Sequence, residues 1–336
     1  MNKIAKVIID VNKGFVPAQF SAMSKEEMTE SVRKEMLSVF GLETYNKKDF
    51  RRALRKNDLL VCEIIEEVID ANIRTGDEIL GEFSRRFVDF RTLDLGDENL
   101  FYVKGKKDLI VSEFAGGYIN ARRQRYESGQ SFPIDLKNYV ISTYIYFEQL
   151  VSGRLDLAEF VMALNDAIAK KMKSVMLQTF QAGLTNLPAA YKFSAAYDED
   201  LIIEMLTKLE AVNQARPMLI GTASAIYKLQ SHLDFSDNMK DAKNNDYTLG
   251  KWLGYDVIVL PNEIEPGTID TLMLDDKIYC IAGDTKLLKF VQSGDVMVKS
   301  NEEKTEHGDL TLNYEASTSF GAAICYSGLA GTIDLL

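Results

Sequence analysis

The residue types that most often carry out chemistry are sparse in this sequence and are not grouped. The chain has two histidines, His232 and His307, which lie far apart among polar neighbours. A single histidine provides neither a paired acid–base site nor a zinc site. The segment 10–14 has the spacing of the start of a calcium loop, but the glutamate that completes such a loop is missing.

Motifs for catalysis and nucleotide binding are also absent. The sequence contains no glycine-rich dinucleotide or phosphate loop, no HExxH, no GxSxG and no CxxC. Adjacent acids such as Glu66 and Glu67 are typical of solvated surfaces rather than of catalytic pairs. We therefore expect no catalytic residue, no metal site and no cofactor, and we expect that the chain is not an enzyme.

Composition and charge predict a globular protein with an acidic surface. Apolar residues make up 46% of the 336 residues, which is enough for a large core and about two domains. The net charge of −11 repels nucleic acid on average, so any contact with DNA would be local and weak. Three widely spaced cysteines, Cys62, Cys280 and Cys325, indicate buried thiols in a reducing compartment. No apolar run is long enough for a membrane span.

The pattern that organises the rest of the chain lies between Asp156 and Gly183. Apolar residues recur there at steps of three and four, which predicts one long helix with a single buried stripe. Asp156 and Glu159 predict the start of this helix, and Gly183 predicts its end. At ~1.5 Å per residue such a helix would be about 37 Å long, two to three times the average.

The segments before this helix predict charged helices and then a loop that has little core of its own. Helices are expected at 24–41, 49–56 and 58–73, and strands at 99–103, 109–113, 132–136 and 139–147. The strand at 109–113 would pair with 99–103 around a turn, and a basic, glycine-flanked stretch follows it. A hairpin of this kind is marginal in water and exposes its edges. We expect an arm that lies on a neighbouring subunit, and a long surface loop is the alternative.

The second half of the chain predicts a compact α/β unit over residues 217–300. Helices are expected at 198–215, 223–233 and 285–291, and strands at 217–221, 255–260, 272–274, 277–282 and 295–299. Alternation in 309–326 predicts a tail strand that returns to the long helix, and Gly328 and Gly331 predict a bend after it.

These features are typical of a subunit that tiles into a protein layer and holds its neighbours with arms. In order and spacing, the segments resemble the bacteriophage major capsid proteins of the Hong Kong 97 type. The resemblance covers about residues 90–330. It is carried by the segment 132–150, the helix at 156–180, the strands at 217–221 and 253–261, Ala282-Gly-Asp284, and the tail around Glu315-Ala316.

The resemblance implies an α+β fold of the Hong Kong 97 capsid type, with an extended β-hairpin loop. The expected parts are an N-terminal helical arm (1–90), the extended loop with its flanking strands (91–140), a peripheral domain (141–215 and 308–336) with a spine helix at 156–182, and an α/β axial domain (216–307).

The function that the resemblance implies is that of a major capsid protein. Such a protein self-assembles into pentamers and hexamers of an icosahedral or prolate shell around phage DNA. Implied partners are the chain itself, scaffold, portal and decoration proteins, and double-stranded DNA by weak non-specific contact, with no membrane. The protein would belong to the virion capsid after assembly in the bacterial host cytoplasm. An encapsulin-like nanocompartment shell, and a cytosolic enzyme with a site between the 217–300 block and the long helix, are the alternatives.

The same resemblance implies a set of contact residues between subunits. The loop would reach across the adjacent subunit with its tip at Gly116 and Gly117, and three arginines would pair with acids of the neighbour. The arginines are Arg122, Arg123 and Arg125, and the candidate acids near the start of the spine helix are Glu148, Asp156 and Glu159. Simple solvation of these charges is the alternative interpretation.

Three lysines of the long helix, Lys170, Lys171 and Lys173, leave its apolar stripe. The resemblance places this region near the inner surface of a shell, where the lysines could touch packaged DNA. The alternative is that they only make the surface soluble.

Overall fold

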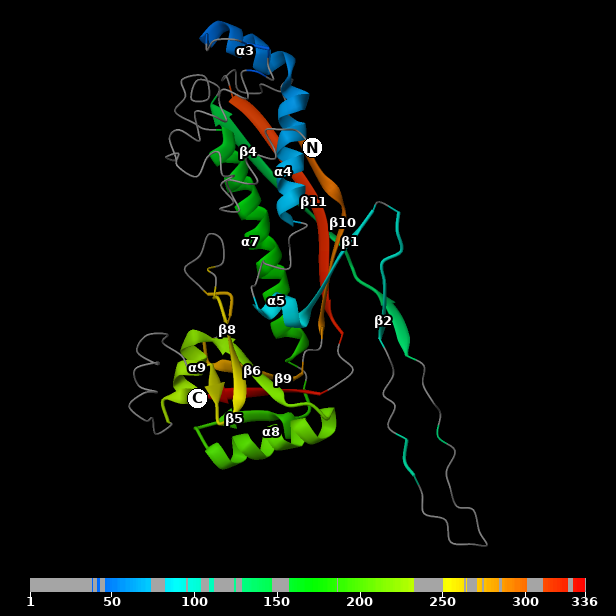
Figure 1. The fold of residues 1–336 in the computed structure, drawn as a ribbon, viewed down its shortest axis with the longest axis vertical. Helices are drawn as coiled ribbons and strands as arrows, with labels where there is room; N and C mark the ends of the chain where they lie inside the picture. The colour runs from blue at the N-terminus through cyan, green and yellow to red at the C-terminus, as the bar shows by residue number, and fades with distance from the viewer. Residues whose placement is uncertain are drawn as a thin grey trace.

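The computed structural model describes most of the chain in ranges with gaps between them. The described residues are 38, 41–42, 46–73, 82–94, 96–103, 109–111, 124, 129–146, 157–185, 187–232, 250–262, 264, 271–273, 275–283, 286–300, 311–325 and 329–335. They form an elongated sheet, a second sheet across its lower end, and a two-stranded hairpin at the side (Figure 1). Among these residues, no helix has both the length and the apolar character needed to cross a bilayer.

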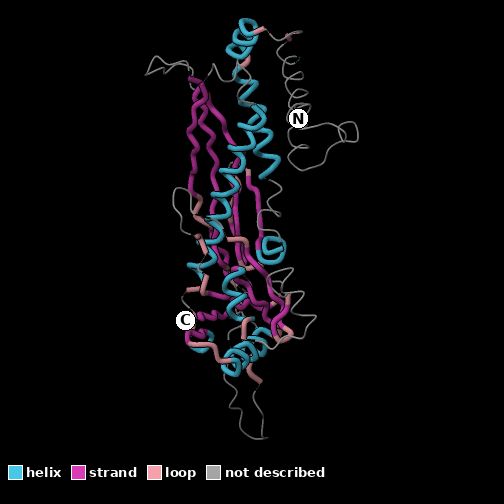
Figure 2. The backbone as a smooth tube through the Cα atoms, turned by 90° about the vertical axis from the view of Figure 1, so that its left-hand side faces the viewer, coloured by secondary structure: helices cyan, strands magenta, loops and turns pink. Residues whose placement is uncertain are grey.

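The elongated sheet has four strands in the order β1-β10-β11-β4. Strand β1 (Val88–Leu93) runs parallel to β10 (Leu288–Ser300), and β11 (Thr311–Ile324) lies antiparallel between β10 and β4 (Lys137–Tyr146). Helix α7 (Leu157–Gly183) packs on β11, α4 (Asp58–Ile73) packs on β10, and the two helices contact each other. They therefore cover the same side of the sheet (Figure 2). Helix α3 (Lys47–Lys56) precedes α4, and α5 (Glu82–Phe87) leads into β1.

Helix α7 confirms the expected long helix, with 27 residues. Its inward side chains follow the predicted steps and are at most 5% exposed; they include Val161, Leu164, Ile168, Met172, Met176 and Phe180. At the end of the helix, the ring of Phe180 meets Phe83 of α5 at 5.3 Å and Tyr279 of the second sheet at 4.8 Å, edge to face in both cases. One helix thus packs against both sheets.

The second sheet has six strands in the order β5-β12-β9-β6-β8-β7. Their bounds are β5 Lys192–Ala195, β12 Ala330–Leu335, β9 Lys277–Ala282, β6 Pro217–Thr222, β8 Tyr255–Leu260 and β7 Lys251–Trp252. Helices α8 (Glu199–Asn213) and α9 (Ala223–Gln230) pack on it, and a short 3-10 helix (Ala189–Tyr191) precedes β5. Asp198 and Thr222 cap the two α-helices by accepting hydrogen bonds from backbone N–H groups in their first turns.

In its upper part, β10 has no described strand on one side, and helix α4 covers this edge. Strand β1 ends opposite Ser293. Beyond that point, the carboxylates of Asp70 and Glu66 accept hydrogen bonds from the backbone N–H groups of Val296 (3.0 Å) and Val298 (2.7 Å). The two acids are one helical turn apart on the same face of α4. Two donors of the strand edge are therefore satisfied by side chains instead of by another strand.

Most of the expected elements are confirmed. The strands β6, β8 and β9, the helices α3, α4, α8 and α9, and the return of the tail strand β11 to the long helix all agree with the sequence patterns. The buried thiols of Cys62 and Cys280 also agree, and Cys325 is half-buried.

The short helix expected at 285–291 was wrong over its described residues, because β10 already begins at Leu288. The strand expected at 295–299 is confirmed as the later part of the same strand of 13 residues, which has an irregularity between Ser293 and Met297. Residues such as Leu288, Phe290 and Val291 are buried on both faces of the sheet, so the alternation that identifies a strand is lost there.

Gly331 was predicted to mark a bend, yet it lies inside strand β12. A Cβ atom at this position would come within 2.7 Å of Leu209 Cδ1, so glycine is needed here for close packing rather than for a turn. The expected pairing of 99–103 with 109–113 was also wrong, because β2 (Leu100–Val103) pairs with β3 (Gln130–Pro133) and residues 109–111 are not in a strand. Of the expected strand at 272–274, the described residues 272–273 form a bend.

The sheets group four segments differently from the expected domain division. Strand β10 lies in the elongated sheet instead of the 216–307 unit, while β5, α8 and β12 belong with the six-stranded sheet instead of the peripheral part. The domain boundaries themselves stay a prediction.

Gly321 of β11 gives a first testable prediction. A Cβ atom there would collide with the carbonyl oxygen of Asp135, in the connection that crosses β11 on its way into β4. We expect Gly321→Ala to destabilise the subunit by about 1–3 kcal/mol through overpacking, measured by urea unfolding. Gly250→Ala is the matched control, since no atom lies within 4 Å of its Cβ position. Equal stability of the two variants would contradict the close packing.

The strand edge that α4 covers gives a second prediction. Glu66→Ala leaves the N–H of Val298 without its acceptor, so we expect a loss of about 1–3 kcal/mol in the free energy of unfolding. We also expect faster hydrogen exchange at the Val298 amide. Glu63→Ala, at an exposed position of the same helix, should change neither quantity. Unchanged exchange at Val298 in Glu66→Ala would disprove the role given to this carboxylate.

Candidate functional site

The base of the arm, formed by β2 and β3, packs on the face of the elongated sheet that is opposite α7. Phe290 and Val291 are consecutive on β10 and therefore point to opposite faces. Phe290 belongs to the core under α7, whereas Val291 is buried with Phe101 and Ile134 of the arm base. The ring of Phe101 is only 1% exposed. The arm therefore starts from a fixed apolar contact on the sheet.

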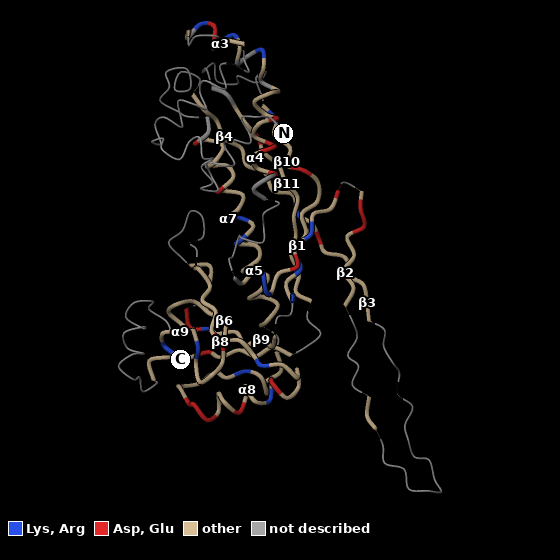
Figure 3. Tube along the Cα trace, in the orientation of Figure 1, with Lys and Arg blue, Asp and Glu red and all other residues tan. Residues whose placement is uncertain are grey.

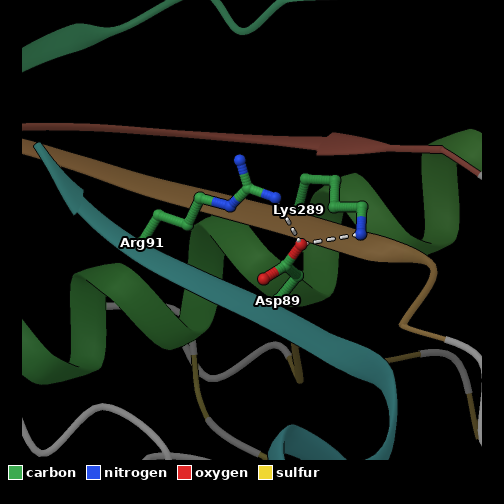
Figure 4. Close-up of polar contacts among 3 residues, drawn as sticks. All are labelled: Asp89, Arg91 and Lys289. Atoms are coloured by element: carbon green, nitrogen blue, oxygen red, sulfur yellow. Dashed lines mark hydrogen bonds and ion pairs between the residues drawn. The ribbon is translucent and has the colours of Figure 1, made fainter. Parts of the chain in front are cut away.

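Three charged side chains lie together beside this contact, and Figure 4 shows the polar contacts among them. The carboxylate of Asp89 accepts a hydrogen bond from Lys289 Nζ at 2.8 Å and one from Arg91 at 3.3 Å. The guanidinium of Arg91 lies over the ring of Phe101, 4.0 Å from its centroid. Burial by itself would raise the pKa of Asp89, but the hydrogen bonds and positive charges of Lys289 and Arg91 outweigh it and lower the pKa.

The described part of the arm beyond β2 includes three consecutive apolar residues that are exposed. Leu109, Ile110 and Val111 are 57%, 76% and 94% exposed. The side chain of Gln124 bridges the arm, because it accepts a hydrogen bond from the N–H of Ile110 at 2.8 Å and donates one to its carbonyl at 2.6 Å. At the root of the arm, Gly129 has a φ of +111°, which side chains other than glycine rarely adopt.

A groove of about 560 Å³ runs between α7 and strand β4. Its apolar lining includes Tyr139, Ile141, Ala167, Ile168 and Phe320, with Tyr139 stacked on Phe320 at 4.2 Å. Lys170 and Lys171 also line it, and Lys171 Nζ lies 5.7 Å from the Tyr139 ring centroid. Figure 3 shows these basic positions midway along α7.

Strand β4 is an edge strand, since no described strand pairs with its outer side. The face of the sheet turned away from α7 carries exposed apolar side chains along this edge. They are Val140 (62% exposed), Tyr144 (61%) and Tyr146 (48%). Long apolar edges attract further strands unless something covers them.

Most of the contact residues implied by the resemblance lie outside the described residues. This holds for Gly116, Gly117, Arg122, Arg123, Arg125, Glu148 and Asp156. Glu159 is exposed in the first turn of α7, Lys170 and Lys171 are exposed at the groove, and Lys173 is half-buried. Their proposed partners stay predictions. No three His, Cys, Asp or Glu side chains gather as metal ligands in the ranges that the structure describes.

The residues that sequence reasoning missed are the apolar triplet 109–111 as an exposed segment and the β4 edge beside the groove. One signal was available for the triplet. Leu109, Ile110 and Val111 interrupt a charged stretch without any polar residue between them, as expected for a strand that needs cover on both faces.

The charge cluster at the arm base predicts a pH dependence. Since the pKa of Asp89 is lowered in the folded chain, its stabilisation is present above the ordinary aspartate pKa and is lost as the pH falls through the folded value. We expect Asp89→Asn to cost about 2 kcal/mol at neutral pH and to remove part of the acid sensitivity. Urea unfolding of the unassembled subunit between pH 7 and pH 3 measures both effects. The control Asp166→Asn, at an exposed position of α7, should behave as the wild type; an Asp89→Asn profile that parallels the wild type would rule out this role.

Comparisons with solved structures show the type of fold. The mature capsid of bacteriophage PhiM1 matches with a TM-score of 0.51 and 10% identity, over 75% of this chain and 86% of that one. The capsid of a native GTA particle matches with a TM-score of 0.50 and 12% identity, over 75% and 89% of the two chains. The expected α+β capsid fold of the Hong Kong 97 type is thereby confirmed in its overall arrangement. No curated protein sequence matches this chain.

A family of protein sequences matches nearly the whole chain. The matched family is described as "SPbeta prophage-derived putative capsid protein YonB", and the match covers residues 1–333. It spans the helices, both sheets and the arm described above. The chain therefore belongs to this family of prophage-derived capsid proteins.

Proposed function

We propose that this chain is a major capsid protein that self-assembles into pentamers and hexamers of a closed shell around phage DNA. The observation that carries the proposal is the arm. Its apolar residues 109–111 are 57–94% exposed in the single subunit, while the base of the arm is anchored by the buried cluster of Phe101, Ile134 and Val291. Three adjacent apolar residues in the open are costly unless another molecule covers them. A second copy of the chain is such a molecule, and the family match favours it.

In this proposal the protein acts by assembly and not by catalysis. Its partners are further copies of itself, with scaffold, portal and decoration proteins as additional partners, and its place is the virion capsid after assembly in the host cytoplasm. The acidic chain would touch packaged DNA weakly and without sequence preference. The prophage-derived family favours the phage shell over a cellular nanocompartment shell.

The test is assembly of the purified full chain, followed by negative-stain electron microscopy and light scattering. We expect shells, tubes or five- and six-membered rings from the wild type. The triple variant L109S/I110S/V111S should remain folded, because its changes lie only on exposed side chains. It should assemble at least tenfold less, because the apolar contact between copies is lost. Leu59→Ser, at an apolar position of α4 that is 80% exposed, is the control and should assemble normally.

A wild-type chain that stays monomeric over a range of salt concentrations and with crowding agents would overturn the proposal. Normal assembly of the triple variant would be compatible with the shell function but would show that residues 109–111 are not needed for assembly.

A further inference from the structure

Helix α3 is strongly basic, although it belongs to an acidic chain. Six of its ten residues are Lys or Arg and one is Asp, which gives the helix a net charge of +5. The whole chain has a net charge of −11. With Asp58 and Glu63 of the following helix included, residues 46–63 still carry +3. Figure 3 shows α3 at the end of the molecule that is opposite the six-stranded sheet. Positive charge concentrated on one helix indicates an anionic partner at this place.

Three of the basic residues form one exposed row along α3. Lys48, Arg52 and Lys56 follow one another at steps of four, so they share one face of the helix, and all three are exposed. None of the three forms an ion pair with a residue that the structure describes. At ~1.5 Å per residue, the row is about 12 Å long. We call these three residues the basic row.

Helix α3 is fixed to the protein at both ends and along another face. The side chain of Asn46 accepts a hydrogen bond from the N–H of Lys48 at 3.3 Å, and the N–H of Asn57 donates one to the carbonyl of Ala53 at 2.9 Å. Ala53 packs against the main hydrophobic core. Asp49, the one acid of the helix, accepts a hydrogen bond from the Asn46 amide at 2.9 Å. The basic row is therefore held in place before any partner binds, which reduces the entropy cost of binding.

Several exposed lysines elsewhere already face acids. Lys208, Lys228 and Lys251, around the six-stranded sheet, each form an ion pair with a carboxylate. On α7, Asp166 lies one helical turn before Lys170 and reduces the positive charge there. Salt screens charges over ~8 Å at physiological ionic strength, so acids at the far end of the molecule do not cancel the basic row.

We propose that the basic row of α3 binds the phosphate backbone of packaged double-stranded DNA. This inference rests on the proposed shell function and names the surface of the chain that the DNA contacts. Each DNA strand carries one phosphate per ~3.4 Å of helix axis, so the basic row spans roughly three to four phosphates of one strand. Contacts to phosphates carry no sequence information, as suits a protein that encloses a whole genome.

An anionic membrane is the other large polyanionic surface, and the structure favours DNA over it. A helix that lies in a membrane interface buries its apolar face among the lipids. The apolar positions of α3 are 50, 53 and 54, which share one face of the helix. Ala53 on this face packs against the core of the protein. This face therefore meets the protein instead of a bilayer.

The test removes the charge of the basic row and keeps the helix. The variant K48Q/R52Q/K56Q changes only exposed side chains, and glutamine forms helices about as well as lysine and arginine do. Circular dichroism and urea unfolding verify that this row variant is folded.

The control variant K192Q/K208Q/K251Q removes the same amount of charge from exposed positions around the six-stranded sheet. Fluorescently labelled DNA duplexes of two unrelated sequences are titrated into each unassembled full-length chain at several salt concentrations. Binding is measured by fluorescence anisotropy.

We expect the wild type and the control variant to bind DNA equally, and the row variant to bind at least tenfold more weakly. Each phosphate contact contributes about −0.9 to the slope of log K against log salt concentration, so this slope should be smaller by about 2–3 in the row variant. The two duplexes should bind alike. Equal DNA binding by all three chains, or no binding by the wild type, would overturn the proposal.

Two further measurements separate this inference from the shell function. Light scattering should show that the row variant assembles as the wild type does. A row variant that keeps its DNA affinity but assembles less would assign α3 to contacts between copies, and tighter binding of the wild type to phosphatidylglycerol vesicles than to DNA would assign it to a membrane. Either result refutes the proposal. Shells formed by a wild-type chain that does not bind DNA would support the capsid function and refute the role of α3.

Discussion

The packing of α7 against two sheets at once is the constraint on which the rest of the structure depends. Its apolar stripe covers the elongated sheet, and Phe180 at its end is in contact with both Phe83 and Tyr279. A helix is stiff over this length, so the orientation of the second sheet follows from the packing of one side chain cluster. The arm is fixed to the same frame because Val291, which anchors it, lies on the reverse face of a strand that α7 helps to bury.

The two long edges of the elongated sheet differ in what covers them. Beyond the end of β1, the carboxylates of Glu66 and Asp70 satisfy two amides of β10, so this edge accepts no strand there. No described strand pairs with the outer side of β4, and apolar residues line both of its faces. Covering one of the two edges limits edge-to-edge aggregation of the sheet.

The sequence predicted the parts of the fold in which local pattern and burial agree. The stripe of α7, the helices expected at 198–215 and 223–233, and strands such as 255–260 could all be identified from spacing. Prediction failed where tertiary contacts decide. Strand β10 is buried on both faces and lost its alternation, and Gly331 is required by the proximity of Leu209, which no local pattern reveals. Strand β2 pairs with β3 and not with the nearer residues 109–113. This pairing depends on the buried contact between Phe101 and Val291, which lie far apart in the sequence. The apolar groove between α7 and β4 exists only after these two elements have packed, so no sequence pattern reveals it.

The contacts that anchor the arm base also determine the order in which parts of the chain can fold during synthesis. Asp89 and Lys289 are 200 residues apart in sequence, and β1 pairs with β10 in parallel. During synthesis, the arm leaves the ribosome long before the strand that holds its base. Its direction is undefined until β10 has been made and has folded onto α7. The anchored geometry of the arm base thus becomes available only to a nearly finished chain.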